Sequence, residues 1–215
     1  MSRRKTREQT PGEELANSIT HGAGFVLSIA CLVLVVVFAA MRRDAWRVVS
    51  CAIYGATLIL LYASSTLYHG LRPGRAKHVF NILDHSAIYL LVAGTYTPFM
   101  LVPLRGGLGW TFFGLIWALA AAGIVYQALF INRYRVLSLV TYLGMGWLVV
   151  FTLPGLVRAL PLAGLVWLAL GGVLYTVGSV FYAWHSQRFA HAIWHVFVLG
   201  GSLCHFFGVL FYVVL

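Results

Sequence analysis

The stretch His191-Ala-Ile-Trp-His195 opens an apolar segment that continues to Leu215, and it places two imidazoles four residues apart. In an α-helix, four residues turn by about 400°, so the two rings share a face and lie roughly 6 Å apart along the axis. Histidine is costly inside a membrane span and usually faces the protein interior or a watery cavity. Two histidines on one face therefore suggest a shared task, and binding of a metal ion is the first hypothesis.

The composition of the whole chain indicates its class. The 215 residues are 61% hydrophobic and only 9% charged, with a mean hydropathy of +0.88. Soluble globular domains contain far fewer apolar residues, so we predict an all-α protein that crosses the membrane several times. The apolar runs argue against a transmembrane β-barrel, because they lack the strict alternation of polar and apolar residues that its strands require.

The chain carries a formal net charge of +10. Its lysines and arginines lie between the apolar runs, so they indicate membrane topology and contact with anionic head groups rather than binding of nucleic acid. The three cysteines lie within apolar runs and show no pairing motif. We interpret them as small core residues, namely Cys31, Cys51 and Cys204.

Seven apolar segments follow a polar tail at residues 1–16, and each is close to the roughly twenty residues needed to cross the hydrocarbon core. Their predicted limits are about 17–40, 46–71, 79–103, 108–130, 136–157, 162–184 and 190–215. With the amino end in the cytoplasm, ten of the fifteen lysines and arginines lie on the inner side, among them Arg3, Arg4, Lys5 and Arg7. The positive-inside rule therefore predicts a seven-transmembrane helix bundle with a cytoplasmic amino end and an exterior carboxyl end.

This topology brings many polar residues of the spans to one depth. Odd-numbered spans begin at the cytoplasmic face and even-numbered spans end there, so residues at those ends lie within about three helical turns of the cytoplasmic edge. They are Glu14, Asn17 and His21 of the first span, Ser65 and His69 of the second, Asp84 of the third, and His191 and His195 of the seventh. Scattered core groups would have no reason to gather at one level, so we predict a common site.

Three of these residues suit a zinc ion. His69, His191 and His195 could supply three nitrogens at about 2.0 Å, which leaves the fourth position that a catalytic zinc keeps open for water. Asp84 could be a fourth ligand, but we favour a role as the base that holds and deprotonates the water. Ser65 is one helical turn from His69 and could hold its ring or a bound water. We therefore predict Asp84 and Ser65 as catalytic residues.

Simpler interpretations of these residues stay open. A carboxylate at a helix start is an ordinary partner of the helix dipole, so Asp84 could instead pair with Lys77 or Arg75. The three polar residues of the first span could form an interfacial cap and hydrogen-bond cluster as readily as hold the histidines in place. His205 lies about 15 Å deeper than His195, and we expect it to make an ordinary core hydrogen bond.

The same residues carry a resemblance to a known family. The chain resembles the hemolysin III proteins, the bacterial branch of the progestin and adiponectin receptor (PAQR) family, over nearly its whole length after about residue 13. The matching elements are Glu14-x-x-Asn17-x-x-x-His21, Ser65-x-x-x-His69, Leu83-Asp84-His85-Ser86-Ala87-Ile88 running on to Gly94-Thr95-Tyr96-Thr97-Pro98, and His191-x-x-x-His195. Each piece alone is weak, and the combination in this order is specific.

The resemblance implies seven transmembrane helices in a bacterial inner membrane, with the amino end cytoplasmic. It also implies a zinc ion bound by His69, His191 and His195, which Asp84 reaches through water. Adiponectin receptors are described as ceramide hydrolases and the wider superfamily includes alkaline ceramidases, so the resemblance implies hydrolysis of a lipid amide or ester, linked to membrane lipid homeostasis. We expect no hormone-receptor role, because the long amino-terminal domain of the receptors has no counterpart here.

Three functions are consistent with the sequence. The leading hypothesis is a metal-dependent hydrolase of a membrane lipid, because three histidines and a carboxylate share one depth and no Ser-His-Asp or Cys-His set is in view. The second is a non-enzymatic membrane sensor or regulator in which structural zinc clamps the second, third and seventh spans. The third is a pore-forming haemolysin, which ranks last because no polar stripe crosses the whole membrane.

Overall fold

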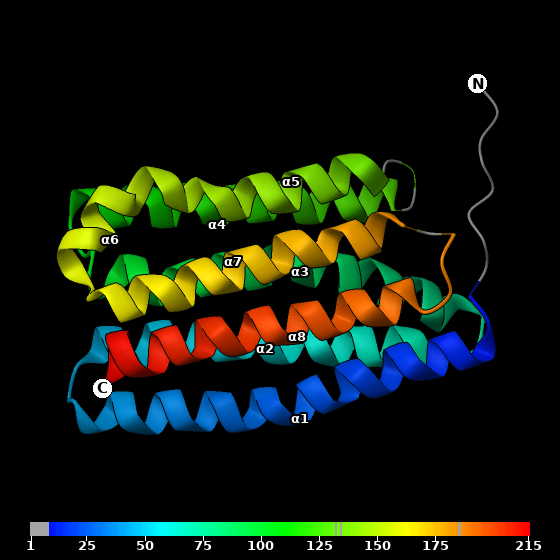
Figure 1. Ribbon diagram of the computed structural model, residues 1–215, viewed down its shortest axis with the longest axis horizontal. Helices are drawn as coiled ribbons and strands as arrows, with labels where there is room; N and C mark the ends of the chain where they lie inside the picture. Colours follow the sequence, from blue (N-terminus) through cyan, green and yellow to red (C-terminus); the bar gives the residue numbers. More distant parts are fainter. Residues whose placement is uncertain (1–8, 132, 134, 185) are drawn as a thin grey trace.

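The structure is a computed structural model that describes residues 9–131, 133, 135–184 and 186–215. Within these residues every regular element is helical, and the long helices run side by side along one bundle (Figure 1). The elements are α1 (Pro11–Met41), α2 (Ala45–Gly70), α3 (Arg75–Leu101), α4 (Gly107–Phe130), α5 (Arg135–Trp147), the 3₁₀ helix η1 (Leu148–Thr152), α6 (Leu153–Ala159), α7 (Leu162–Ala183), α8 (Ala190–Val209) and the π-helical turn η2 (Leu210–Val214). The predicted all-helical fold is confirmed.

In the described part of the chain, six segments are long and apolar enough to cross a membrane. They are Pro11–Met41, Ala45–Gly70, Gly107–Phe130, Val136–Ala159, Leu162–Ala183 and Ala190–Val214. Helix α3 is long enough, at 27 residues, but it is less apolar and is not among the six. A bundle of membrane-spanning helices is thus confirmed, whereas the seventh span and the cytoplasmic amino end stay predictions. The basic residues predicted for the tail, Arg3, Arg4, Lys5 and Arg7, lie outside the described residues.

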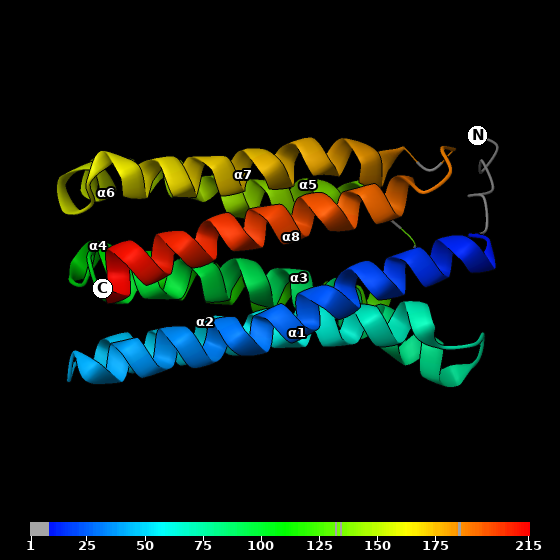
Figure 2. The same cartoon turned by 60° about the horizontal axis from the view of Figure 1, so that its bottom comes forward.

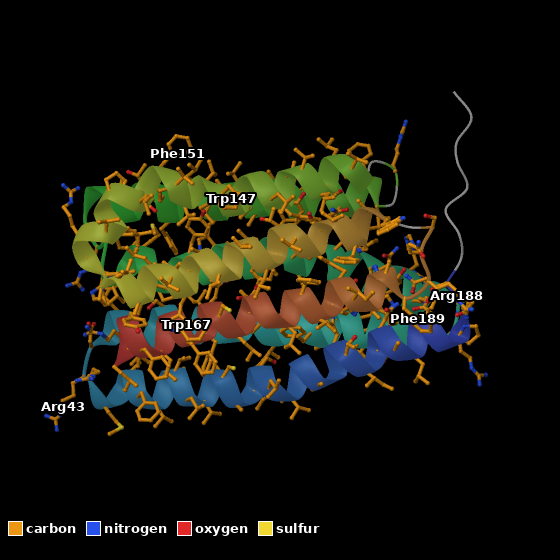
Figure 3. The ribbon with its side chains drawn as sticks, viewed as in Figure 1. Arg43, Trp147, Phe151, Trp167, Arg188 and Phe189 are labelled. Atoms are coloured by element: carbon orange, nitrogen blue, oxygen red, sulfur yellow. The ribbon has the colours of Figure 1, made fainter. Side chains whose placement is uncertain are left out.

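The outer faces of the helices are apolar. Large hydrophobic side chains are exposed along the bundle, including Val26, Leu129, Val136 and Phe151. Phe151 projects away from the helices in Figure 3. Water-soluble proteins rarely expose apolar patches of this extent, so these faces are suited to the acyl chains of a bilayer.

Helix α1 begins ahead of the predicted span at 17–40, because its first turn has strong local start signals. Thr10 is the N-cap, Pro11 follows it, and the Glu13 side chain accepts hydrogen bonds from the backbone N–H and the hydroxyl of Thr10 at 2.9 Å. This capping box fixes the start of the helix. Residues 11–16, predicted as part of the polar tail, are therefore helical, and Glu13 and Glu14 lie in the first turn of α1.

The fifth predicted segment, 136–157, is not one continuous helix. It consists of α5, the short 3₁₀ helix η1 and α6, which begins with Pro154 in its first turn. Proline has no N–H to donate to the preceding turn and its ring crowds the carbonyl there, so the α-helix is interrupted just before it. Helices α5, η1 and α6 still follow one another along one side of the bundle (Figure 1).

Helix α1 lies along α2 and also contacts α8, so the two ends of the described chain meet in one part of the bundle (Figure 2). A glycine permits the close approach of α1 to α2, because a Cβ at Gly24 would lie 2.5 Å from the Tyr62 ring. At one end of the pair, Arg42 donates a hydrogen bond to the carbonyl of Val214 at 3.1 Å. Helices α2 and α8 carry the three histidines described next, and α1 packs against both.

Candidate metal centre

Three histidines from two helices that are far apart in the sequence come together near one end of the bundle. His69 lies in the last turn of α2, while His191 and His195 lie one turn apart at the start of α8. Each offers a ring nitrogen, and these nitrogens all lie within 4.8 Å of one another. The ring of His69 is 5.0 Å from that of His191 and 5.1 Å from that of His195, measured between centroids. Such a group of imidazoles could hold a metal ion.

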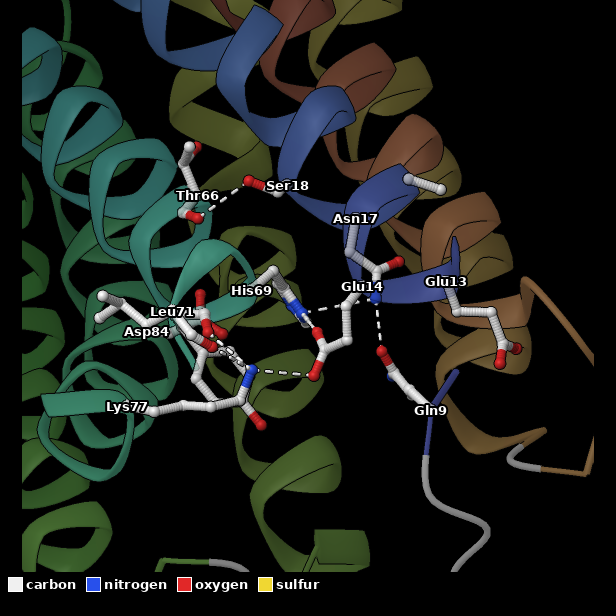
Figure 4. Close-up of polar contacts among 12 residues, drawn as sticks. Gln9, Glu13, Glu14, Asn17, Ser18, Thr66, His69, Leu71, Lys77 and Asp84 are labelled. Atoms are coloured by element: carbon white, nitrogen blue, oxygen red, sulfur yellow. Dashed lines mark hydrogen bonds and ion pairs between the residues drawn. The ribbon is translucent and has the colours of Figure 1, made fainter. Parts of the chain in front are cut away.

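The orientation of His69 is set by α1. The carboxylate of Glu14 lies 2.6 Å from His69 Nδ1 and also accepts a hydrogen bond from the ammonium of Lys77 at 2.9 Å (Figure 4). A carboxylate is only an acceptor, so the proton of the neutral ring resides on Nδ1 and the lone pair on Nε2. His69 Nε2 is buried and has no hydrogen-bond partner among the described residues. A buried lone pair of this kind calls for a partner such as a metal ion.

His195 is held in the same way by the backbone of α1. Its Nδ1 lies 3.2 Å from the carbonyl oxygen of Asn17 and 3.3 Å from the hydroxyl of Thr20. Because a carbonyl can only accept, Nδ1 carries the proton and Nε2 is left as the atom able to bind a metal. The side chain of Asn17 points instead toward His69, with its amide nitrogen 3.4 Å from Nδ1.

His21 packs directly against this cluster. Its ring stacks on His195 with centroids 3.5 Å apart and meets the edge of the Tyr62 ring at 5.0 Å. It is fully buried and neither of its nitrogens has a hydrogen-bond partner among the residues described. The structure thus brings together the three polar residues predicted on the first span, with Glu14 and Asn17 contacting the histidine rings through hydrogen bonds and His21 through stacking.

Asp84 and Ser65 are buried beside the cluster. Asp84 Oδ2 lies 3.9 Å from His85 Nδ1, and its side chain lines the same cavity as His191 and His195. The alternative partner Lys77 binds Glu14 and the backbone carbonyls of α2 and the following loop instead. The hydroxyl of Ser65 is fully buried without a hydrogen-bond partner in the described structure. Asp84 therefore lies where it could contact a ligand bound near the histidines, whereas Ser65 is buried and is not among the residues that line the cavity.

A second glutamate, which the sequence did not suggest, fixes the start of α8. Glu13 Oε1 accepts a hydrogen bond from the backbone N–H of Phe189 at 2.9 Å. Phe189 precedes α8 and has a φ of 57°, a left-handed conformation that costs about 1–3 kcal/mol for a residue other than glycine. It lies at this end of the bundle in Figure 3. Glu13 therefore holds the turn from which His191 and His195 follow.

His191, His195 and Asp84 lie at the polar end of a partly open cavity, and His69 is not among the residues that line it. Its volume is about 350 Å³, and apart from a few polar groups its walls are apolar side chains of α3, α5, η1, α6, α7 and α8. The histidine and carboxylate side chains that line it are His21, Asp84, His85, His191, His195 and His205. Hydropathy alone did not predict this cavity, because each of its walls comes from a different helix.

The cavity also has a wall that the sequence did not single out. The hydroxyl of Tyr182 lies 3.5 Å from His85 Nε2, and its ring packs 6.0 Å from that of His191. His85 Nδ1 in turn lies 3.0 Å from the carbonyl of Asn81. Tyr182 lies on α7 and contacts the site from a different helix. The local spacing of residues in the sequence does not indicate such a contact, so the sequence could not identify Tyr182.

Comparison with known proteins agrees with the predicted resemblance. Residues 10–206 match the family described as "Haemolysin-III related". The chain is 52% identical over 202 residues to a hemolysin-3 homolog of Bacillus subtilis, with 94% of this chain and 95% of the relative covered. It is 47% identical to hemolysin-3 of Bacillus cereus, over 100% of this chain and 98% of the relative. A human relative, monocyte to macrophage differentiation factor, is 30% identical over 92% of this chain and 83% of its own. This chain therefore belongs to the haemolysin-III-related family of multi-pass membrane proteins.

Proposed function

We propose that this protein is a metal-dependent hydrolase that cleaves an amide or ester bond of an acyl lipid within the membrane. The observation that carries the proposal is the position of Asp84 and of two residues of the histidine cluster, His191 and His195, at one end of a largely apolar cavity of about 350 Å³. Pockets of about 300–1,000 Å³ are typical of small-molecule sites. A hydrocarbon chain is matched to the apolar walls, and its polar end would then lie beside Asp84 and the histidines.

The residues fit a zinc ion. His69 and His195 each have Nδ1 against an oxygen of α1, so both present Nε2, and neutral imidazole is a preferred ligand of zinc. Nitrogens bound to one zinc lie roughly 3.3 Å apart when the bonds are about 2.0 Å, so the three rings would turn slightly inward from their present spread of up to 4.8 Å. When bound, zinc supplies a Lewis acid that polarises a carbonyl and makes water more acidic.

The chain's own residues supply the proton transfers. We assign Asp84 as the base that accepts a proton from water as the water oxygen bonds to the acyl carbon. The same proton then passes to the nitrogen or oxygen that leaves when the amide or ester bond breaks. We propose that the hydroxyl of Ser65, which is buried without a hydrogen-bond partner among the described residues, donates a hydrogen bond to the reacting water or to the Asp84 carboxylate. The apolar walls exclude bulk water and hold the chain in position.

One alternative is that the metal has only a structural role. The histidines join α2 to α8, and Glu14 and Asn17 add α1, so an ion there would tie three helices together. A protein of this kind would act as a membrane sensor or regulator without catalysis. The third hypothesis, a pore-forming haemolysin, draws on the name hemolysin-3, which belongs to the relatives. The largely apolar cavity of this chain does not favour a water-filled pore.

The bacterial relatives also support a cellular location. We propose that the protein resides in the bacterial inner membrane with its amino end in the cytoplasm, in accord with the excess of lysine and arginine on that side. Its lipid substrate would then come from the surrounding bilayer, and its activity would adjust membrane lipid composition.

Replacing Glu14 by Gln is expected to weaken zinc binding by about 10–100-fold, the usual effect of losing a carboxylate that holds a histidine ligand. The neutral amide accepts a weaker hydrogen bond from His69 and leaves the Lys77 ammonium without its anion. Zinc affinity is measured by competition with a chromogenic chelator. Asp44→Asn is the matched control, because Asp44 lies at the other end of α2 and contacts Arg47. Equal affinities for wild type and Glu14→Gln would remove Glu14 from the site.

The proposed activity is tested with purified protein loaded with zinc in lipid nanodiscs. Ceramides, other N-acyl lipids, diacyl phospholipids and lysophospholipids are offered, and released fatty acid is measured by mass spectrometry. We expect release from at least one amide or ester class, loss of release after chelation, and its return when zinc is restored. If zinc is bound in full and no lipid in this panel is hydrolysed, the hydrolase proposal is wrong.

A further inference from the structure

His205 is a buried histidine of α8 that the proposed hydrolysis does not use. Its Nε2 lies 3.3 Å from the carbonyl oxygen of Leu168 on α7. Since a carbonyl only accepts, Nε2 carries the proton of the neutral ring and Nδ1 is left with a lone pair. Nδ1 is buried and has no hydrogen-bond partner among the described residues. The core hydrogen bond that we predicted for His205 is therefore present, but it engages only one of the two ring nitrogens.

The surrounding helices are shaped to hold this ring. A Cβ at position 171 would lie 2.4 Å from His205 Nε2, so only glycine leaves space for the imidazole against α7. The ring of Tyr175 also packs against the His205 ring, with centroids 5.4 Å apart. A buried polar atom without a partner is costly, and native proteins keep few of them. The His205 ring is closely packed, yet its Nδ1 has no hydrogen-bond partner among the described residues. This combination is what we expect of a nitrogen that binds a group of a ligand.

The side chain of His205 lines the same cavity as the metal centre. It is ten residues after His195 on one helix, so the two lie about 15 Å apart along the axis. The polar neighbours at this depth are already engaged: the Tyr175 hydroxyl lies 2.9 Å from Ser202 Oγ, and the Thr95 hydroxyl donates to the carbonyl of Leu91 at 2.8 Å. His205 Nδ1 is thus a buried acceptor without a partner among the described residues, on a residue that lines the apolar part of the cavity.

We propose that His205 forms a second binding subsite, which accepts a hydrogen bond from a hydroxyl group carried partway along the hydrocarbon chain of the ligand. The inference rests on the proposed function, since it requires an acyl chain in the cavity. With the polar end of the lipid at the histidine cluster, a chain hydroxyl about 15 Å farther along would meet Nδ1. The subsite selects lipids whose acyl chain bears a hydroxyl at that distance over lipids with a plain chain.

The test compares fatty acids that differ only in one hydroxyl. Stearic acid and stearic acids hydroxylated beside the carboxylate, at mid-chain or near the methyl end compete with a fluorescent fatty acid for zinc-loaded protein in nanodiscs. We expect the mid-chain form to bind about 3- to 10-fold more tightly than stearic acid, the usual value of one added hydrogen bond. His205→Leu should abolish this preference and keep the affinity for stearic acid, whereas His205→Asn, which retains an acceptor, should keep part of it.

The controls separate this inference from the proposed function. His78→Leu removes an exposed histidine outside the cavity and should leave every affinity unchanged. If wild type binds all the fatty acids equally, the subsite is refuted and the hydrolase proposal stands. If wild type binds none of them, the subsite is refuted, and the hydrolase proposal is decided separately by the lipid hydrolysis assay. If His205→Leu and His205→Asn both lose stearic acid itself, His205 has a structural role and the subsite is refuted.

Discussion

Purified His191→Ala protein is expected to retain roughly a tenth or less of the zinc bound by wild type. Two remaining imidazoles do not complete a protein site for zinc, since stable sites use at least three protein ligands. Metal content is measured by elemental analysis after both proteins are purified side by side and dialysed against buffer without metal. Loss of lipid hydrolysis should accompany the loss of metal, because the proposed chemistry depends on the ion.

His78→Ala is the matched control for this experiment. It removes an exposed imidazole from the start of α3, away from the cluster, so the metal content should stay at the wild-type value. A full complement of zinc in His191→Ala would show that the ion, if present, binds elsewhere. It would also remove the main support for a metal-dependent function.

Asp84→Asn is expected to bind zinc as wild type does and to hydrolyse lipid about 10²–10⁴-fold more slowly. The amide has nearly the shape of the carboxylate but cannot accept a proton from water, and general base catalysis contributes about this factor. Released fatty acid and bound metal are measured on the same preparation. Because metal and activity are recorded together, a lost ion cannot be mistaken for a lost base.

Two outcomes would redirect the interpretation of Asp84. If Asp84→Asn loses zinc as well, the carboxylate is a metal ligand, which is the alternative considered from the sequence. If it keeps both zinc and activity, the base is another group and a structural metal becomes the better account. Asp44→Asn, a change of the same chemistry near the α1–α2 connector, should affect neither quantity.

The histidine cluster was predictable because two kinds of regularity point to it. The spacing of His191 and His195 places both rings on one helical face, and their centroids are 4.6 Å apart in the structure. His69 is far away in sequence and was assigned by its depth in the membrane and by the family resemblance. Hydropathy and charge fix where each span begins and ends, so they give depth along the bundle axis well.

The contacts between helices were not predictable in the same way. The side chain of Asn17 was expected to act at the site, yet it is the backbone carbonyl of Asn17 that holds His195. Glu13 binds the backbone of Phe189, and Lys77 pairs with Glu14 rather than with Asp84, the partner considered from the sequence. Such pairings depend on how each helix is rotated about its axis and where it crosses its neighbour, and local sequence does not determine these quantities.

The differences in helix limits have a simpler origin. The early start of α1 follows from Thr10, Pro11 and Glu13, which are readable as a capping box but do not contribute to an apolar run. The break before α6 follows from Pro154. Apolar runs report which residues face lipid, whereas helix ends are set by capping and proline, so the two kinds of boundary need not coincide.

The contacts that α1 makes at the histidine cluster have a consequence for biosynthesis. His195 takes its orientation from the backbone of Asn17, and the turn before α8 is held by Glu13, so the earliest and latest parts of the described chain must meet before the cluster exists. A nascent polypeptide whose α8 has not yet left the ribosome lacks these contacts between α1 and α8. Under the proposed function it would neither bind the ion nor hydrolyse lipids of the bilayer into which it is being inserted, and a chain truncated before α8 would lack both activities for the same reason.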